Sequence, residues 1–172
     1  MGNFDKAIEQ TLALEGFGSL VDDILDPGGL TRWGISQKSY PEVDIGRLTR
    51  DQAIAMYRRD FWHPLYDQIE SEELATELFD FGVNTSSRGW PKVGVRILQE
   101  SVGYLAVGPI VADGAFGPQT LGAVNAAPPD LLLKEFRARQ AFYYANIVIR
   151  APDAEEWKKK RYLLGWFRRV MA

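Results

Sequence analysis

The sequence contains no cysteine and only one histidine, and these two absences exclude several kinds of catalytic site. Without cysteine there are no disulfides, no thiol nucleophile and no thiolate metal ligand. With His63 alone, a zinc site containing two imidazoles is impossible, and a Ser-His-Asp triad would need that one residue. We therefore expect neither a metal nor a cofactor, and hydrolytic chemistry would most naturally fall to carboxylates.

The chain also lacks a strong excess of positive charge. It has 20 basic and 23 acidic side chains, a net charge of −3, which argues against a general nucleic-acid binder. Residues 131–172 nevertheless hold ten basic and four acidic side chains, a net charge of +6, and the preceding residues carry −9. This basic tail could meet an anionic polymer, although a solvated helix face is the simpler explanation.

Long apolar runs are missing as well. No stretch approaches eighteen uninterrupted apolar residues, so we expect no stable insertion into a membrane. Residues 1–6 do not begin a basic region followed by an apolar run, so a Sec signal is not predicted. We expect a protein made in the cytoplasm that acts outside it only after release or dedicated export.

What the sequence does have is the composition of a globular protein. Of its 172 residues, 46% are hydrophobic and 25% are charged. These fractions are ordinary for a folded globular protein and argue against a disordered chain. The length fits one domain, or a catalytic lobe with a small appended one.

Apolar spacing and Gly/Pro breaks predict a mainly α fold. A capping box at 49–52, Pro118 at a first helical position and Asp130 as an N-cap mark three of the helix starts. Residues 16–35 are rich in Gly, Asp and Pro and predict a small hairpin or irregular loop. The predicted helices cover residues 3–15, 49–59, 71–83, 90–102, 118–125 and 130–150, with a last one after 153.

One carboxylate precedes this loop region and a second lies within it, and the sequence predicts different surroundings for the two. Glu15 ends the first predicted helix beside Leu14 and Phe17, where partial desolvation would favour its protonated form. Asp26 follows in a polar loop that would keep it ionised, and Thr31 stands at the next turn. Such a pair suits a general acid and its partner, although a helix-end glutamate and an Asp-Pro-Gly turn also occur for structural reasons alone.

Several motifs follow one another along the first half of the chain, at residues 15–16, 26–31, 33–35, 56–62 and 78–84. Together they resemble the N-terminal signature of glycoside hydrolase family 108, the N-acetylmuramidases of the lysozyme-like superfamily found in phages, prophages and bacterial secretion loci. Residues 98–99 and 113–121 are similar to the predicted peptidoglycan-binding segment in that family's C-terminal half.

The resemblance implies a lysozyme-like catalytic region over residues 1–87 and a peptidoglycan-binding helical region over 88–172. We expect the two regions to pack as one globular unit and the protein to be a monomer. It implies cleavage of the β-1,4 bond between N-acetylmuramic acid and N-acetylglucosamine at the cell wall, as in an endolysin. Glu15 matches the family's catalytic glutamate, and by analogy with phage-type lysozymes Asp26 and Thr31 are its partners. Asp22 and Asp23 are rivals for the second carboxylate, and Asp22 is also a substrate-binding candidate.

Other positions have a functional and a structural explanation. Tyr57 could stack on a sugar face or pack in the core, and Asn84 could bind an acetamido group or cap its helix. His63 is expected to be a capped or packed residue. Family members usually continue the catalytic glutamate with two glycines, and here the second is Phe17, which either deepens the apolar wall around Glu15 or narrows a sugar subsite.

Two other functions stay open at this point. One is a catalytically inactive peptidoglycan-binding or scaffold module. The other is a lytic transglycosylase, which needs one acid and leaves an anhydro end. Whether a hydrolase of this kind inverts or retains depends on the separation of its two carboxylates.

Overall fold

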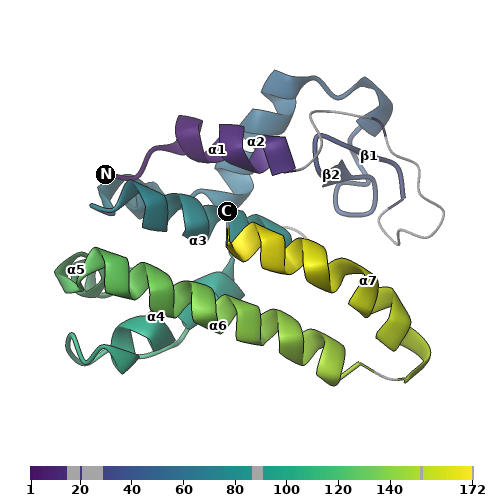
Figure 1. Ribbon diagram of the computed structural model, residues 1–172. Helices are drawn as coiled ribbons and strands as arrows, with labels where there is room; N and C mark the ends of the chain where they lie inside the picture. Colours follow the sequence, from purple (N-terminus) through teal and green to yellow (C-terminus); the bar gives the residue numbers. More distant parts are fainter. Residues whose placement is uncertain (15–19, 21–28, 87–90, 152, 172) are drawn as a thin grey trace.

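The protein is described by a computed structural model covering residues 1–14, 20, 29–86, 91–151 and 153–171. In this part of the chain the structure is mainly α, with one short two-stranded sheet (Figure 1). The helices are α1 (Phe4–Leu14), α2 (Arg50–Phe61), α3 (Glu72–Thr85), α4 (Lys92–Tyr104), α5 (Pro118–Ala126), α6 (Pro129–Ile149) and α7 (Asp153–Val170). The strands are β1 (Thr31–Arg32) and β2 (Ile35–Ser36), and the 3₁₀ helices are η1 (Ile45–Arg47) and η2 (Pro64–Gln68).

Local sequence signals explain where α2 and α5 begin. The hydroxyl of Thr49 accepts from the backbone N–H of Gln52, and the Gln52 side chain accepts from the Thr49 N–H, which completes the predicted capping box of α2. Pro118 occupies the first turn of α5, as expected. The prediction that Asp130 caps α6 is wrong, because α6 begins at Pro129 and Asp130 lies in its first turn. A carboxylate in the first turn still interacts favourably with the helix dipole.

Helix α3 is the centre of the molecule. It packs against α1 and α2 on one side and against α4 and α6 on the other, while α7 runs back along α6 (Figure 1). The ring of Phe79 on α3 lies edge-on to those of Phe4 and Trp62, at centroid distances of 5.7 and 5.5 Å respectively. The apolar core is therefore continuous through both halves of the chain.

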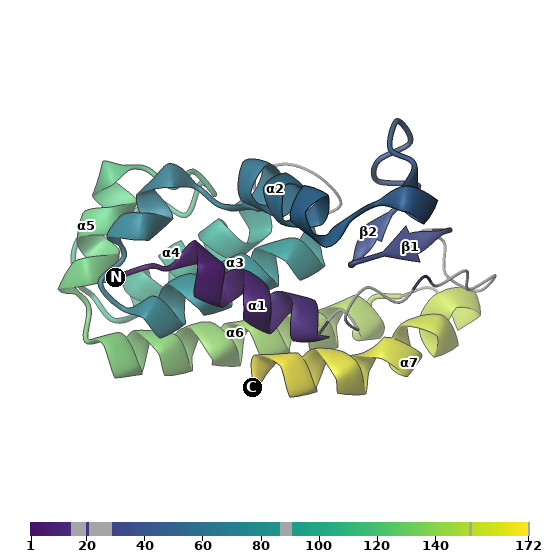
Figure 2. The same ribbon diagram turned by 90° about the horizontal axis from the view of Figure 1, so that it is seen from above.

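The sheet and α5 lie at opposite ends of the molecule. Viewed from above, the hairpin β1–β2 lies beyond the C-terminal end of α1, and α5 lies beside the N-terminus (Figures 1 and 2). The hairpin lies at the end of the 16–35 region, where a hairpin or irregular loop was predicted, and extends one residue beyond it to Ser36; neither 3₁₀ helix was predicted.

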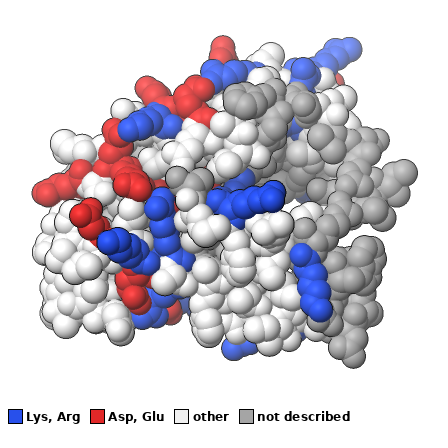
Figure 3. All heavy atoms as spheres, in the orientation of Figure 1, with Lys and Arg blue, Asp and Glu red and all other residues white. Residues whose placement is uncertain are grey.

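Charge is unevenly spread over the surface. Acidic side chains gather on the left of the view, where α1 and the start of α3 lie, whereas basic ones are scattered among them and across the middle of this face (Figure 3). Among the described residues, no helix has both the length and the apolar character needed to cross a bilayer.

Candidate active site

The hairpin after α1 is built around a tight two-residue turn. Thr31 pairs with Ser36 and Arg32 with Ile35, so Trp33 and Gly34 form the turn. Both have positive φ, 55° and 73°, as a type I′ turn requires. A tryptophan in this conformation is strained, so it must be held by other contacts.

Those contacts come from the segment that follows the hairpin. The Trp33 carbonyl accepts a hydrogen bond from the Tyr57 hydroxyl at 3.0 Å, and the indole N–H donates to the Leu48 carbonyl at 3.3 Å. Arg32 donates to the carbonyl of Gly46 at 2.8 Å. The hairpin is thereby fixed against η1 and α2.

The predicted site residues divide into two groups. Glu15, Asp22, Asp23 and Asp26 lie outside the described residues, with Glu15 directly following Leu14 of α1 in the sequence. Thr31 lies half-buried in β1, where its hydroxyl donates to the Gly29 carbonyl at 3.1 Å.

The substrate-binding candidates within the described chain are both engaged with protein groups. Tyr57 is 1% exposed, and its ring packs at 5.8 Å from Phe61. This burial places Tyr57 in the core, where it supports the hairpin through Trp33. Asn84 is half-buried in the last turn of α3 and donates through Nδ2 to the buried hydroxyl of Tyr144; the C-cap of α3 is Ser86.

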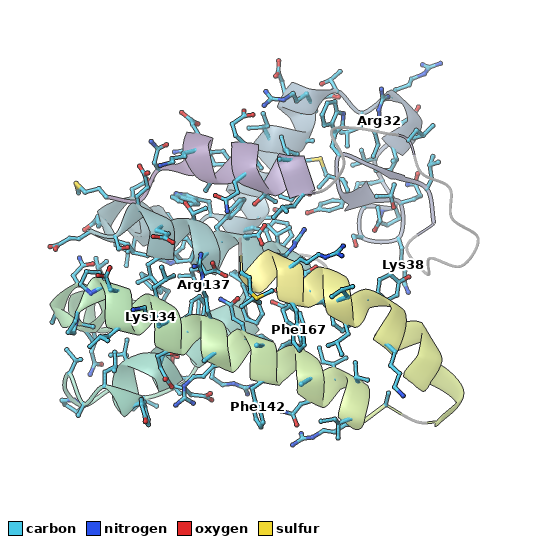
Figure 4. The ribbon with its side chains drawn as sticks, in the orientation of Figure 1. Arg32, Lys38, Lys134, Arg137, Phe142 and Phe167 are labelled. Atoms are coloured by element: carbon cyan, nitrogen blue, oxygen red, sulfur yellow. The ribbon has the colours of Figure 1, made fainter. Side chains whose placement is uncertain are left out.

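Asn84 ends a row of polar residues along α3. Glu77, Asp80 and Asn84 follow helical spacing, so they share one face of α3. Glu77 accepts from Arg137 of α6 at 2.9 Å, and Figure 4 shows Arg137 at the seam between the two helices.

The middle member of this row joins three helices. Asp80, 5% exposed, accepts from the Thr11 hydroxyl of α1 at 2.9 Å through Oδ1. Its Oδ2 lies 3.6 Å from Nε of Arg169 on α7. Thr11 is four residues before Glu15, so this contact fixes the last described turn of α1, the helix that leads to the predicted acid.

Burial is the main influence on the pKa of Glu77, the first residue of this row. It raises the pKa of the Glu77 carboxyl above its usual value, and the Arg137 guanidinium offsets part of that increase. Buried charges need such partners, because an unpaired one is strongly destabilising.

A second polar cluster explains the motif at 113–121. Gln99, 1% exposed on α4, donates to Asp113 Oδ1 and to the Ala115 carbonyl, both at 3.0 Å, and accepts from the Gly114 N–H at 2.8 Å. Asp113 also accepts from the Ala115 N–H at 2.8 Å, and these hydrogen bonds lower the pKa of its carboxyl. The motif residues therefore fix the loop before α5.

Comparison with known proteins assigns both halves of the chain. A family model described as glycosyl hydrolase 108 matches residues 8–85. Residues 8–85 therefore carry a family 108 region. A second model, described as a predicted peptidoglycan domain, matches residues 93–171. With these two regions, the protein is a glycoside hydrolase acting on peptidoglycan.

The chain also shares its fold with a solved structure. That of Brucella abortus SagA matches with a TM-score of 0.75 at 23% identity, over 98% of this chain and 89% of that one. The predicted mainly α, lysozyme-like fold is confirmed. No curated protein matches the chain in sequence.

The sequence alone did not predict the polar row of α3, formed by Glu77, Asp80 and Asn84. Asp80 lies within the 78–84 motif that carried the family resemblance, but its partners belong to α1 and α7. The available signal was a carboxylate flanked by Phe79 and Phe81, which both belong to the core. A charge in such a position requires a buried partner.

Proposed function

We propose that this chain is an N-acetylmuramidase, which hydrolyses the β-1,4 bond between N-acetylmuramic acid and N-acetylglucosamine. The observation that carries the proposal is the family 108 match over residues 8–85, which encloses Glu15, Asp26 and Thr31. The rigid hairpin beyond the end of α1 supports it, because a catalytic hydroxyl needs a fixed backbone.

In this proposal Glu15 donates its proton to the leaving glycosidic oxygen. Asp26 either activates the attacking water or stabilises the oxocarbenium-like transition state. Thr31 holds the water or a sugar hydroxyl, and Asp22, four residues before Asp26 in the sequence, contacts the sugar. Tyr57 contributes by holding Trp33, and Asn84 offers Oδ1 to an acetamido N–H.

In this proposal the two regions have different roles. Residues 1–87 carry the chemistry and residues 88–172 hold the wall polymer. The buried contacts of Glu77 and Asp80 with α6 and α7 favour one rigid unit over a tethered binding module.

The deciding experiment digests purified peptidoglycan and identifies the new ends by mass spectrometry after borohydride reduction. We expect reduced N-acetylmuramic acid ends. Glu15→Gln should lower the rate about 10²- to 10⁴-fold, the range expected for loss of a general acid. Glu9→Gln, which alters an exposed glutamate of α1 that pairs with Arg50 of α2, serves as the matched control and should stay active.

Other products would overturn the proposal in distinct ways. N-acetylglucosamine reducing ends indicate cleavage of the other glycosidic bond, and anhydro ends that persist in Asp26→Asn indicate a lytic transglycosylase. Wall binding without any loss of turbidity indicates an inactive module. The anomer formed first, read by NMR, separates inversion from retention.

A further inference from the structure

Helix α6 is apolar on two opposite faces. One face packs against α3, α4 and α7, and its buried residues are Leu132, Leu133, Phe136, Gln140, Tyr144 and Val148. Helical spacing places another set on the opposite face: Leu131, Ala138, Phe142, Ala145 and Ile149. We call this second set the α6 stripe.

The α6 stripe is open to solvent. Leu131, Phe142 and Ile149 are 53, 70 and 76% exposed. Figure 4 shows Phe142 at the lower edge of α6, pointing away from α3 and α7. Single exposed apolar residues are ordinary, but a continuous stripe of them marks an interaction surface. Its steps of seven, four, three and four residues are those of a seam between two helices.

A groove of about 630 Å³ lies beside the stripe, between α6 and α4. Phe142 and Tyr143 line it from α6, and Ile97 lines it from α4, so the groove extends the apolar surface. Because α6 lies on the side of α3 opposite α1, this surface leaves the proposed catalytic hairpin free (Figures 1 and 2).

Four polar side chains lie together on the flank of the stripe that borders the groove. They follow one another at steps of four, seven and four residues: Glu135, Arg139, Asn146 and Arg150. Glu135 accepts from Arg139 at 2.7 Å through Oε1, which leaves Oε2 for another donor. Arg150 is exposed and forms no ion pair within the described part of the chain.

These side chains complement one another when a second α6 lies antiparallel to the first. A two-fold axis at the level of residues 142 and 143 places Glu135 opposite Arg150 of the second copy, and the symmetry repeats this pair. Arg139 then lies opposite Asn146 of the second copy. The Nδ2 of Asn146 donates to the Phe142 carbonyl, so its Oδ1 can accept from that guanidinium.

The same axis brings the two Phe142 rings together at the centre, where an aromatic pair adds to the burial of apolar area. A parallel pair would instead set each charge at the level of its own copy. The antiparallel arrangement is therefore the one that the charges favour.

We propose that two copies of this chain associate through their α6 stripes, antiparallel and two-fold symmetric, with Phe142 at the centre and Glu135 paired with Arg150 on either side. One helix and one groove per copy make a small interface, so we expect a reversible dimer. The sequence led us to expect a monomer, because the stripe is evident only once the buried face of α6 is known. The proposal does not depend on the proposed function.

The first test measures the mass of the purified wild type by sedimentation velocity, from about 10 µM to about 1 mM, the range expected for a small interface. We expect the mass to rise from that of one chain toward that of two. Phe142→Asp should remain monomeric throughout and keep its Tm, because Phe142 is exposed in the single chain. Val111→Asp, at a valine that is 72% exposed outside the stripe, is the matched control and should dimerise as the wild type does.

Charge reversal tests the pairing. Arg150→Glu faces Glu135 with a like charge and should weaken association about 3- to 30-fold, and Glu135→Arg should act in the same direction. The double variant should recover association, because it restores the opposite charges across the axis. Association of the double variant as weak as that of both single variants would overturn the pairing.

The absence of cysteine allows the register to be tested directly. In the proposed dimer the two residues at position 142 face each other across packed helices, within reach of a disulfide. The two residues at position 149 are about 20 Å apart along the helices, at 1.5 Å per residue. Under mild oxidation Phe142→Cys should therefore cross-link much faster than Ile149→Cys, and an equal or reversed preference would overturn the register.

Two further results would overturn the proposal as a whole. One is a wild type with the mass of a single chain at every concentration. The other is a monomer that binds vesicles of anionic phospholipid and loses this binding in Phe142→Asp, which would assign the stripe to a lipid surface. Digestion of peptidoglycan judges the proposed function separately.

Discussion

Asp80 and Arg169 form an ion pair in the interior between α3 and α7, with Oδ2 and Nε 3.6 Å apart. Their side chains are 7% and 12% exposed, so both charges are largely removed from water. The aspartate belongs to the region matched by the hydrolase family and the arginine to the region matched by the peptidoglycan domain. The pair therefore joins the two regions.

Breaking this pair from one side should be far more damaging than removing it entirely. Arg169→Gln removes the guanidinium that pairs with this buried carboxylate and is expected to cost about 3–5 kcal/mol of unfolding free energy. The double variant with Asp80→Asn should recover much of that loss, because asparagine keeps an acceptor for Thr11. Urea denaturation of the single and double variants measures the difference. Equal stability of the wild type and Arg169→Gln would contradict this account.

The hydroxyl of Tyr57 should matter for the hairpin more than for the core. Tyr57→Phe removes the hydrogen bond to the Trp33 carbonyl and is expected to cost about 0.5–1.5 kcal/mol. Amide exchange at Ile35 and Ser36 should become faster, and peptidoglycan hydrolysis should fall if Thr31 acts as proposed. Tyr104→Phe, at a tyrosine that is 69% exposed, is the control and should change neither quantity.

His63 should make stability depend on pH near neutrality. Its pKa is lowered from 6.5 by burial, so the unfolded chain binds the proton more tightly than the folded one. The contribution to stability is thus complete above about pH 6.5 and is lost as the pH falls through the lowered value. Asparagine can accept from the Leu65 N–H without titrating, so His63→Asn should flatten this part of the Tm curve. Since the chain has one histidine, the difference between the two curves isolates its effect.

Glycine substitutions in the α4–α5 connection separate backbone strain from steric clash. Gly114→Ala meets both, because φ is 76° and the new Cβ would lie 2.8 Å from the Lys92 carbonyl oxygen. Gly108→Ala meets only strain, at a φ of 133° with open space around it, and Gly117→Ala meets neither. Losses of unfolding free energy should fall in that order, with Gly117→Ala within about 0.5 kcal/mol of the wild type. A Gly114→Ala variant as stable as Gly117→Ala would show that the loop can move away from α4.

Local signals in the sequence predicted the helices well, because each depends on a few neighbouring residues. Thr49 and Gln52 cap α2 regardless of the rest of the fold, and Pro118 starts α5 in the same way. Asp130 shows the limit of such signals: two adjacent prolines shift the start of α6, so the capping residue is displaced by two positions.

The contacts around the site were not predictable in this manner. That Tyr57 would hold Trp33 depends on how α2 packs against the hairpin, 24 residues earlier in the chain. Asp80 meets Thr11 across 69 residues of sequence, and only the assembled helices bring them together. The catalytic assignment of Glu15, Asp26 and Thr31 comes from the motif resemblance and stays a prediction.

The polar row of α3 also bears on the exchange of parts between cell-wall hydrolases. Separating residues 93–171 from the first half would leave Glu77 without Arg137 and Asp80 without Arg169. A chimera that keeps residues 8–85 and receives a foreign wall-binding half must therefore supply cations at both positions, or replace both acids with uncharged residues of similar size. Grafting at the 85–93 junction alone should yield misfolded protein, whereas grafts with matched partners can fold.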